Sequence, residues 1–439
     1  MLYYFTEISK YIITALMCLY ILECIIYEIK KEDYLECDGI VVRQRIYMLL
    51  IQAVSYMTVV LRTGELDYLF LCFFVQIILF ATMTLSSLIY PCVDKILLNN
   101  MALLLSIGFI ILSRLDFDKA IKQFFIVTVS IVIGMFIPYI IKKIPDIQYF
   151  DWIYAAVGAG MLLVVLVLGK ATYGSKITYS IGGITFQPSE IVKIIFIFAM
   201  AAMLSKAKRF TDVLITTLVA ATHVLILVFC KDLGSALVFF IAYLFMLFIA
   251  TRSYVYLVMG LLAGGVCAVA GYQLFAHVRV RVQAFLDPFS VIESAGYQIS
   301  QSLFAISCGS YFGMGLTKGL PKDIPFVATD FVFSAIAEEM GVVFAIGVLL
   351  VCFSSFVIMM KAGICKISKF YRLLVIGCAV MYIFQVFLTV GGGTKFIPLT
   401  GVTLPFISYG GTSVLTSIVL FYIAQSVIIL IRDDELQGC

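Results

Sequence analysis

The stretch LGSALVFFIAYLFMLFIA, residues 233–250, decides the fold class of this chain. It contains no charged side chain, and a helix of about 20 largely apolar residues crosses the hydrocarbon core of a bilayer. The rest of the chain has the same character, because 63% of its 439 residues are hydrophobic and only 13% are charged. A typical soluble domain carries about 25% charged residues. The sequence therefore predicts an all-α fold, a polytopic transmembrane helical bundle.

On either side of this stretch, further apolar segments alternate with polar loops. About thirteen segments in all have a length and composition near those of a membrane span. The predicted spans are residues 9–29, 46–61, 68–90, 97–113, 123–141, 152–168, 191–205, 213–230, 233–250, 254–275, 337–360, 372–391 and 412–431. The segments at 46–61 and 191–205 are short for a span.

Basic residues collect in alternate loops, which predicts the orientation of the spans. These loops carry Lys30, Lys31, Arg43, Arg45, Lys142, Lys143, Lys206, Lys208, Arg209, Lys361, Lys366, Lys369 and Arg372. Because Lys and Arg favour the cytoplasmic side, the tail at 432–439 is predicted to be cytoplasmic and the N-terminus exterior. The long segments 169–190 and 276–336, and the shorter 392–411, then lie outside. Functional residues concentrate in such loops.

Composition also narrows the function classes. The net charge of +4 is modest and the basic residues stand in short clusters, so a nucleic-acid-binding face is not expected. The twelve cysteines are scattered and form no CxxC pair, so no metal site is predicted. A divalent cation is the one cofactor that stays open.

A charged motif opens the predicted span at 191. It reads Gln187-Pro188-Ser189-Glu190, followed by Lys193. Proline at a helix start loses no needed donor, and an acid in the first turn favours the positive helix end. Glu190 and Lys193 stand three residues apart, so they share a helix face and can pair. A helix cap at the membrane interface is the structural alternative.

Further motifs stand in the exterior segments. They are Lys231-Asp232-Leu233-Gly234, Arg279-Val280-Arg281, Phe285-Leu286-Asp287-Pro288, Gly296-Tyr297-Gln298, Gln301-Ser302, Thr329-Asp330-Phe331, Glu338-Glu339-Met340-Gly341 and the run from Pro398 to Gly411. The arginines suit an anionic lipid head group. An unpaired acid costs roughly 2.5–3.5 kcal/mol at the centre of a span, so acids beside a span indicate function, or a salt bridge that only orients helices.

In order and spacing, these motifs resemble the SEDS family (shape, elongation, division and sporulation) of the RodA/FtsW/SpoVE group, over about residues 97–431. The resemblance implies a ten-span core, with residues 1–96 as an addition of about three spans. It also implies a peptidoglycan glycosyltransferase that joins the disaccharide units of lipid II by β-1,4 linkages and releases undecaprenyl pyrophosphate. Members of the family act with a class B penicillin-binding protein and other cell-wall machinery, in growth, division or sporulation.

The resemblance also indicates site residues. Glycosyl transfer needs a base for the acceptor hydroxyl and cations for the departing pyrophosphate. Val291 stands where the family has its essential aspartate, so Glu293, and after it Asp287, are the candidate bases. The predicted substrate-binding residues are Lys176, Gln187, Ser189, Glu190, Lys193, Arg279, Arg281, Gln298, Ser302, Asp330, Glu339 and Ser408.

Two other functions compete with polymerisation. Because valine cannot accept a proton, the chain could be a catalytically inactive scaffold that recruits a penicillin-binding protein. Its many spans would also suit a carrier that moves a lipid-linked precursor across the bilayer, although no internal repeat supports that function.

Overall fold

Twelve helices long and apolar enough to cross a membrane form the body of the computed structural model, which describes residues 2–30, 34–168, 170–172, 175–181 and 184–437. These helices are α1 (Leu2–Ile29), α2 (Tyr34–Thr63), α3 (Asp67–Ile89), α4 (Lys95–Leu115), α5 (Phe117–Lys143), α7 (Pro188–Lys206), α8 (Phe210–Phe229), α9 (Leu233–Thr251), α10 (Tyr254–Leu274), α14 (Val342–Ile364), α15 (Lys369–Gly393) and α16 (Gly411–Gln437). One of the thirteen predicted spans, residues 152–168, forms the shorter helix α6 (Asp151–Leu168). The prediction of a helical membrane bundle is confirmed.

The predicted boundary at 337 is wrong. A separate short helix, α13 (Val332–Met340), comes first, and α14 begins only at Val342. Gly341 separates the two with a φ of 91°, and a Cβ on it would lie 2.4 Å from the backbone nitrogen of Gly313. The close approach of a loop, which apolar patterning does not reveal, therefore divides the helix.

The exterior segments also contain regular structure. Segment 276–336 holds α11 (Ala276–Leu286), α12 (Tyr297–Gly309) and the short helix η2 (Pro321–Asp323) as well as α13. A second short helix, η1 (Pro145–Tyr149), precedes α6. Segment 169–190 holds a small antiparallel sheet of β1 (Lys170–Thr172), β2 (Ser175–Ile181) and β3 (Ile184–Phe186), in that order.

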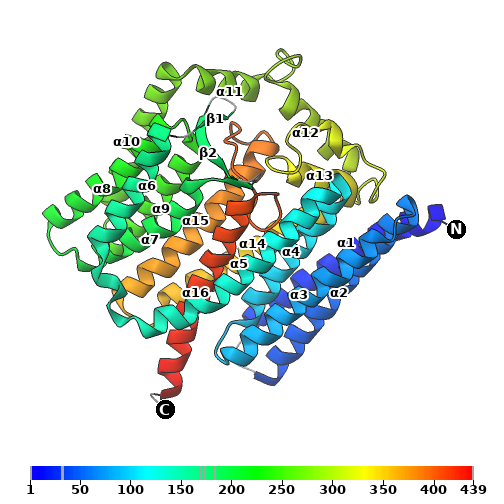
Figure 1. Cartoon of the computed structure of the whole chain (residues 1–439), viewed down its shortest axis with the longest axis horizontal. Coiled ribbons are helices and arrows are strands. Elements are labelled where there is room, and N and C mark those ends of the chain that lie inside the picture. Colours follow the sequence, from blue (N-terminus) through cyan, green and yellow to red (C-terminus); the bar gives the residue numbers. More distant parts are fainter. Residues whose placement is uncertain (1, 31–33, 169, 173–174, 182–183, 438–439) are drawn as a thin grey trace.

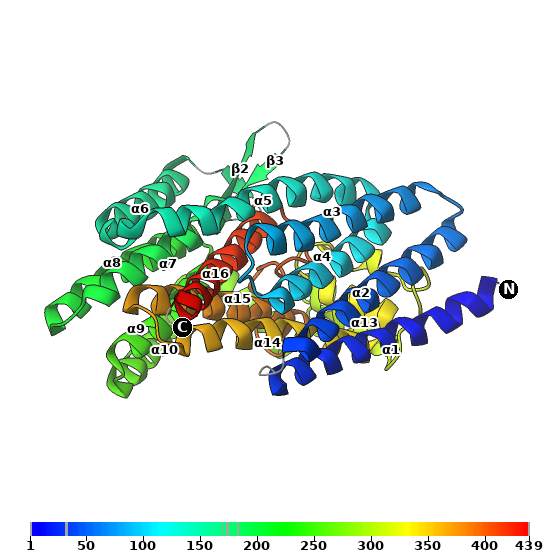
Figure 2. The same cartoon turned by 90° about the horizontal axis from the view of Figure 1, so that it is seen from below.

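The first three helices pack on the rest of the bundle through polar contacts as well as apolar ones. In Figures 1 and 2 they run along one side, next to α4. The hydroxyl of Tyr20 in α1 donates to Oδ1 of Asn100 in α4 at 3.0 Å, and Nδ2 of Asn100 donates to Ser354 of α14 at 3.3 Å. Its neighbour Asn99 donates to the side-chain oxygen of Gln44 in α2 at 3.1 Å. Buried amides with these partners fix the register of the helices.

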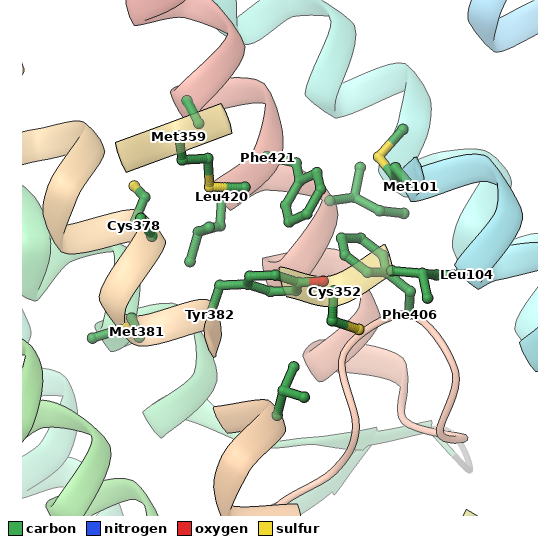
Figure 3. Packing of buried hydrophobic residues seen from close by; sticks show 14 of the residues in the cluster. Met101, Leu104, Cys352, Met359, Cys378, Met381, Tyr382, Phe406, Leu420 and Phe421 are labelled. Carbon is green, nitrogen blue, oxygen red and sulfur yellow. The ribbon is translucent and has the colours of Figure 1, made fainter. Parts of the chain in front are cut away.

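An apolar core lies where α4, α14, α15 and α16 meet the loop after α15 (Figure 3). Three rings form its centre. The ring of Phe421 lies edge-on to those of Tyr382 and Phe406, with centroids 4.9 and 4.6 Å apart. Phe406 belongs to the loop between α15 and α16, so this packing attaches the loop to the bundle. The loop, α11, α12 and α13 all lie at one end of the molecule, away from the C-terminus (Figure 1).

Candidate functional site

The loop that joins α15 to α16, residues 394–410, is the centre of the candidate site. Nη1 of Arg281 in α11 donates to the carbonyl of Thr400 at 3.2 Å. The next residue, Gly401, has a φ of 76°, and a Cβ on it would have as its nearest neighbours Nη2 of Arg281 and Oδ2 of Asp330, each 3.8 Å away. A guanidinium and a carboxylate therefore both lie beside a position with no side chain.

Burial perturbs both charged groups. It raises the pKa of Asp330 to about 6, while the side chain of Thr329 and the charge of Arg281 act in the opposite direction. Burial lowers the pKa of Arg281, against the attraction of Asp330 and Asp232. Carboxylates whose pKa lies near neutrality are typical of functional sites.

Asp330 is positioned by hydrogen bonds that join the chain segment around it to the loop 394–410. The backbone nitrogen of Tyr409 donates to the carbonyl of Ala328 at 2.7 Å. Oγ of Ser408 donates to the carbonyl of Thr329 at 2.5 Å and accepts from the nitrogen of Leu404 at 2.9 Å. Ser408, predicted to bind substrate, thus ties two loops together.

The start of α7 is joined to the start of α9. Nε2 of Gln187 donates to Oγ of Ser189 at 3.1 Å, and Ser189 donates to Oδ2 of Asp232 at 3.2 Å. The other oxygen of Asp232 accepts from the nitrogen of Ser235 at 3.1 Å and caps α9. Gln187 and Ser189 therefore lie in one polar cluster with an acid that acts on Arg281.

Glu190 and Lys193 form the ion pair that their spacing predicts, with Nζ 2.7 Å from Oε1. Lys193 also donates to Oε1 of Gln385 in α15 at 3.0 Å, and Thr416 of α16 donates to Oε2 of Glu190 at 3.0 Å. Only 4% and 6% of the lysine and glutamate side chains are exposed. The pair connects α7, α15 and α16, and its charges are engaged by these helices.

Two more of the predicted residues make bonds inside the scaffold. Glu339, whose side chain is 1% exposed, accepts from Nε of Arg114 at the end of α4 at 3.1 Å and from the nitrogen of Thr317 at 3.1 Å. Ser302 donates to the carbonyl of Gly393 at 2.6 Å, and its oxygen lies 2.6 Å from that of Ser334. These bonds hold α12 and α13 against α4 and α15.

The remaining predicted residues lie nearer to solvent. Arg279, Asp287 and Glu293 are exposed, and Gln298 is half-buried. Oδ1 of Asp287 accepts from the nitrogen of Ser290 at 3.3 Å, which stabilises a turn. Lys176 belongs to β2, and its side chain lies outside the described part of the structure.

Val291, which the resemblance predicts to stand at the family's aspartate position, is half-buried and packs against a small apolar cluster. The cluster includes Ile299, Phe331 and, at its edge, Leu399. Phe331 follows Asp330 in the chain, and Leu399 precedes Thr400. The cluster that Val291 packs against therefore includes chain neighbours of Asp330 and of the carbonyl bound by Arg281.

Sequence reasoning omitted several contributors to this region. Nε2 of Gln123 in α5 donates to the carbonyl of Ser408 at 3.3 Å, and its Oε1 accepts from the nitrogen of Gly410 at 3.4 Å. Gln123, like Gln385, is an amide within an apolar span, a signal that could have been used. Thr400 contributes a backbone carbonyl, which no residue type reveals. Among the described residues, no group of three or more His, Cys, Asp or Glu could hold a metal ion.

The fold and this cluster define an integral membrane protein with a charged site among its loops at one end of the bundle. The chain belongs to the FtsW/RodA/SpoVE family of cell cycle proteins, whose family model matches residues 91–430. It is a multi-pass protein of the bacterial cytoplasmic membrane. Helices α1, α2 and α3 precede the matched region.

Comparisons with individual proteins agree with this membership. The chain is 32% identical over 362 residues to the peptidoglycan glycosyltransferase RodA of Mycobacterium tuberculosis, covering 76% of this chain and 77% of that one. It is 32% identical over 295 residues to the probable peptidoglycan glycosyltransferase FtsW of Bacillus subtilis, covering 62% and 72%.

Two solved structures share the fold. One belongs to a study of how a peptidoglycan synthase complex coordinates polymerization and crosslinking (TM-score 0.64, 25% identity, 78% of this chain and 98% of that one). The other is the rod shape determining protein RodA of Thermus thermophilus (TM-score 0.59, 23% identity, 78% and 97%).

Proposed function

We propose that this chain is a peptidoglycan glycosyltransferase that polymerises lipid II at the exterior face of the cytoplasmic membrane. The observation that carries the proposal is the placement of Arg281 and Asp330 beside Gly401, at the loop end of the bundle. The names of the relatives indicate the reaction class, glycosyl transfer. The placement of Arg281 and Asp330 supplies a cation and an acid near one position, as that reaction requires.

The geometry suits the chemistry of glycosyl transfer. The acceptor hydroxyl must lose a proton as its oxygen attacks, while the pyrophosphate leaves with negative charge. A guanidinium binds phosphate oxygens through two parallel bonds, and burial of Arg281 strengthens that attraction. In this proposal the exposed Arg279 and the β2 residue Lys176 attract the anionic head group, and the half-buried Gln298 contacts its sugars.

The site is assigned to the exterior and the C-terminus to the cytoplasm, because the basic loops gather at the other end of the spans. The start of α1 lies at the same end as the site, since Glu7 pairs with Lys318 in the segment before α13. At the opposite end, the tail residue Asp433 pairs with Lys142 at 2.6 Å.

The proposed partner is a class B penicillin-binding protein that cross-links the nascent strands. Support comes from the fold shared with the peptidoglycan synthase complex, whose study concerns both polymerization and crosslinking. A divalent cation, if the reaction uses one, enters bound to the pyrophosphate oxygens, because those oxygens are ligands that Mg²⁺ prefers.

The test is polymerisation by the purified full-length protein with its cognate penicillin-binding protein and fluorescently labelled lipid II. Glycan strands should form and should disappear on digestion with a muramidase. Failure to form strands, under conditions in which a relative with aspartate at the position of Val291 does so, would reject the proposal.

A second function is favoured by one observation. Val291 packs in an apolar cluster, so the family's acid position is occupied by a group that cannot take a proton. An inactive scaffold of this kind would co-purify with the penicillin-binding protein and stimulate cross-linking by it, yet form no strands from lipid II alone.

A further inference from the structure

The proposed transferase needs a base, and the position that supplies it elsewhere in the family is Val291. We infer that Asp330 is the general base of this chain and replaces the carboxylate missing at position 291. The inference rests on the proposed function and assigns a role within the same site.

The first argument is location. Val291 packs in one small cluster with Phe331 and Leu399, the chain neighbours of Asp330 and Thr400. Asp330 is therefore adjacent in the chain to a member of the cluster against which Val291 packs. The two positions can serve one reacting centre without any rearrangement of helices.

The second argument is the environment of the Asp330 carboxylate. Nη1 of Arg281 donates to the carbonyl of Thr400, and Nη2 of Arg281 and Oδ2 of Asp330 each lie 3.8 Å from the position of a Cβ at Gly401. That position is free of side-chain atoms, because no atom would lie nearer than 3.8 Å to a Cβ there. A sugar hydroxyl placed there would contact the base, and a phosphate would contact the guanidinium.

The third argument is that three other acids of this region are engaged in structural bonds. Asp232 accepts from Ser189 and Ser235. Glu190 and Glu339 are buried in ion pairs with Lys193 and Arg114.

The two bases expected from the sequence fit less well. Asp287 and Glu293 are exposed, and Asp287 stabilises a turn. Neither has the half-buried Arg281 that acts on Asp330, so neither combines a proton acceptor with that cation for the leaving group.

The step is then a single displacement. The Asp330 carboxylate takes the proton of the acceptor sugar hydroxyl, and that oxygen forms a bond to the anomeric carbon of the donor. The bond between this carbon and the phosphate oxygen breaks, and its electron pair leaves with the undecaprenyl pyrophosphate. Arg281 stabilises the negative charge that develops there.

Asp330→Asn in the full-length protein tests the inference, with the partner penicillin-binding protein present. Polymerisation of labelled lipid II should fall by at least about a hundredfold, since general bases contribute that much or more. Binding of lipid II and the melting temperature should stay as in the wild type, because the amide keeps the shape of the side chain. Asp330→Glu should recover part of the activity.

The matched control is Asp323→Asn, which neutralises an exposed acid of the same exterior segment and should leave activity unchanged. If Asp330→Asn polymerises at the wild-type rate, or if it is impaired only because lipid II no longer binds, Asp330 is not the base. Loss of activity in Glu293→Gln with full activity in Asp330→Asn would return the role to Glu293. A wild-type protein that makes no strands would instead reject the proposed function, and this inference with it.

Discussion

Nζ of Lys193 lies 2.7 Å from Oε1 of Glu190 in the interior of the bundle, where three helices meet around the pair. A buried charge that loses its partner is costly, about 3–5 kcal/mol, because desolvation is no longer compensated. Lys193→Met should therefore lower the free energy of unfolding by that amount. Thermal unfolding in detergent measures it.

The double variant Glu190→Gln/Lys193→Met is the control, since it removes both charges. It should regain most of the lost stability, because no uncompensated charge remains. Equal destabilisation by the single and double variants would show that the charges contribute little and that packing dominates.

Arg281→Gln should weaken the use of lipid II. The variant loses a charge-assisted contact of about 1.5–3 kcal/mol, which corresponds to roughly ten- to hundredfold in kcat/KM. Steady-state polymerisation rates over a range of lipid II concentrations measure the effect. Arg279→Gln, which changes an exposed arginine on the same helix, should have a smaller effect. Equal losses in the two variants would indicate a diffuse electrostatic effect in place of a specific contact.

Activity should depend on pH through Asp330. Its pKa is raised to about 6, and a base works only when deprotonated, so the rate should fall about tenfold per unit as pH drops below that value. Arg281 is the charged group that acts on Asp330, and Asp232 in turn acts on Arg281. Burial and the charges of Arg281 and Lys231 lower the pKa of His277. A rate independent of pH between about 5 and 8 would contradict this assignment.

Val291→Asp tests whether the native site already has a general base. If Asp330 is the base, a second carboxylate in the same cluster adds no proton acceptor that the site lacks, so the polymerisation rate should not rise. Stability should fall by about 1–3 kcal/mol, because an acid replaces an apolar side chain packed against the cluster that includes Phe331. A large gain in rate over the wild type would show that the native site lacks its base.

Tyr20→Phe tests whether the first helices are part of the stable fold. The substitution removes the hydroxyl that donates to Oδ1 of Asn100 and leaves the thiol of Cys24, at 3.6 Å, as the donor from α1, so the expected cost is about 0.5–1.5 kcal/mol. The melting temperature in detergent should fall accordingly. Tyr11→Phe, which changes an exposed tyrosine of the same helix, is the control and should have no effect of this size. An unchanged melting temperature in Tyr20→Phe would mean that α1 packs on α4 without help from this bond.

Much of the architecture follows from composition. Apolar segments of span length predict helices directly, since a backbone in hydrocarbon must satisfy its own hydrogen bonds. The Glu190–Lys193 pair could also be predicted from the sequence, because a spacing of three residues on a helix places two side chains together. Ordered motifs predicted the family, and their spacing relative to the family predicts that Val291 stands at the position of its aspartate.

The assembly of the site was decided by tertiary structure. Glu339 and Asp330 lie nine residues apart in similar acidic motifs, yet one is paired with Arg114 and the other faces Arg281. Nothing local distinguishes them, because each partner comes from a helix far away in the chain. The close approach at Gly341 and the carbonyl of Thr400 likewise depend on how loops pack across the end of the bundle. Local sequence sets which segments are helical, and only long-range packing sets which charges meet.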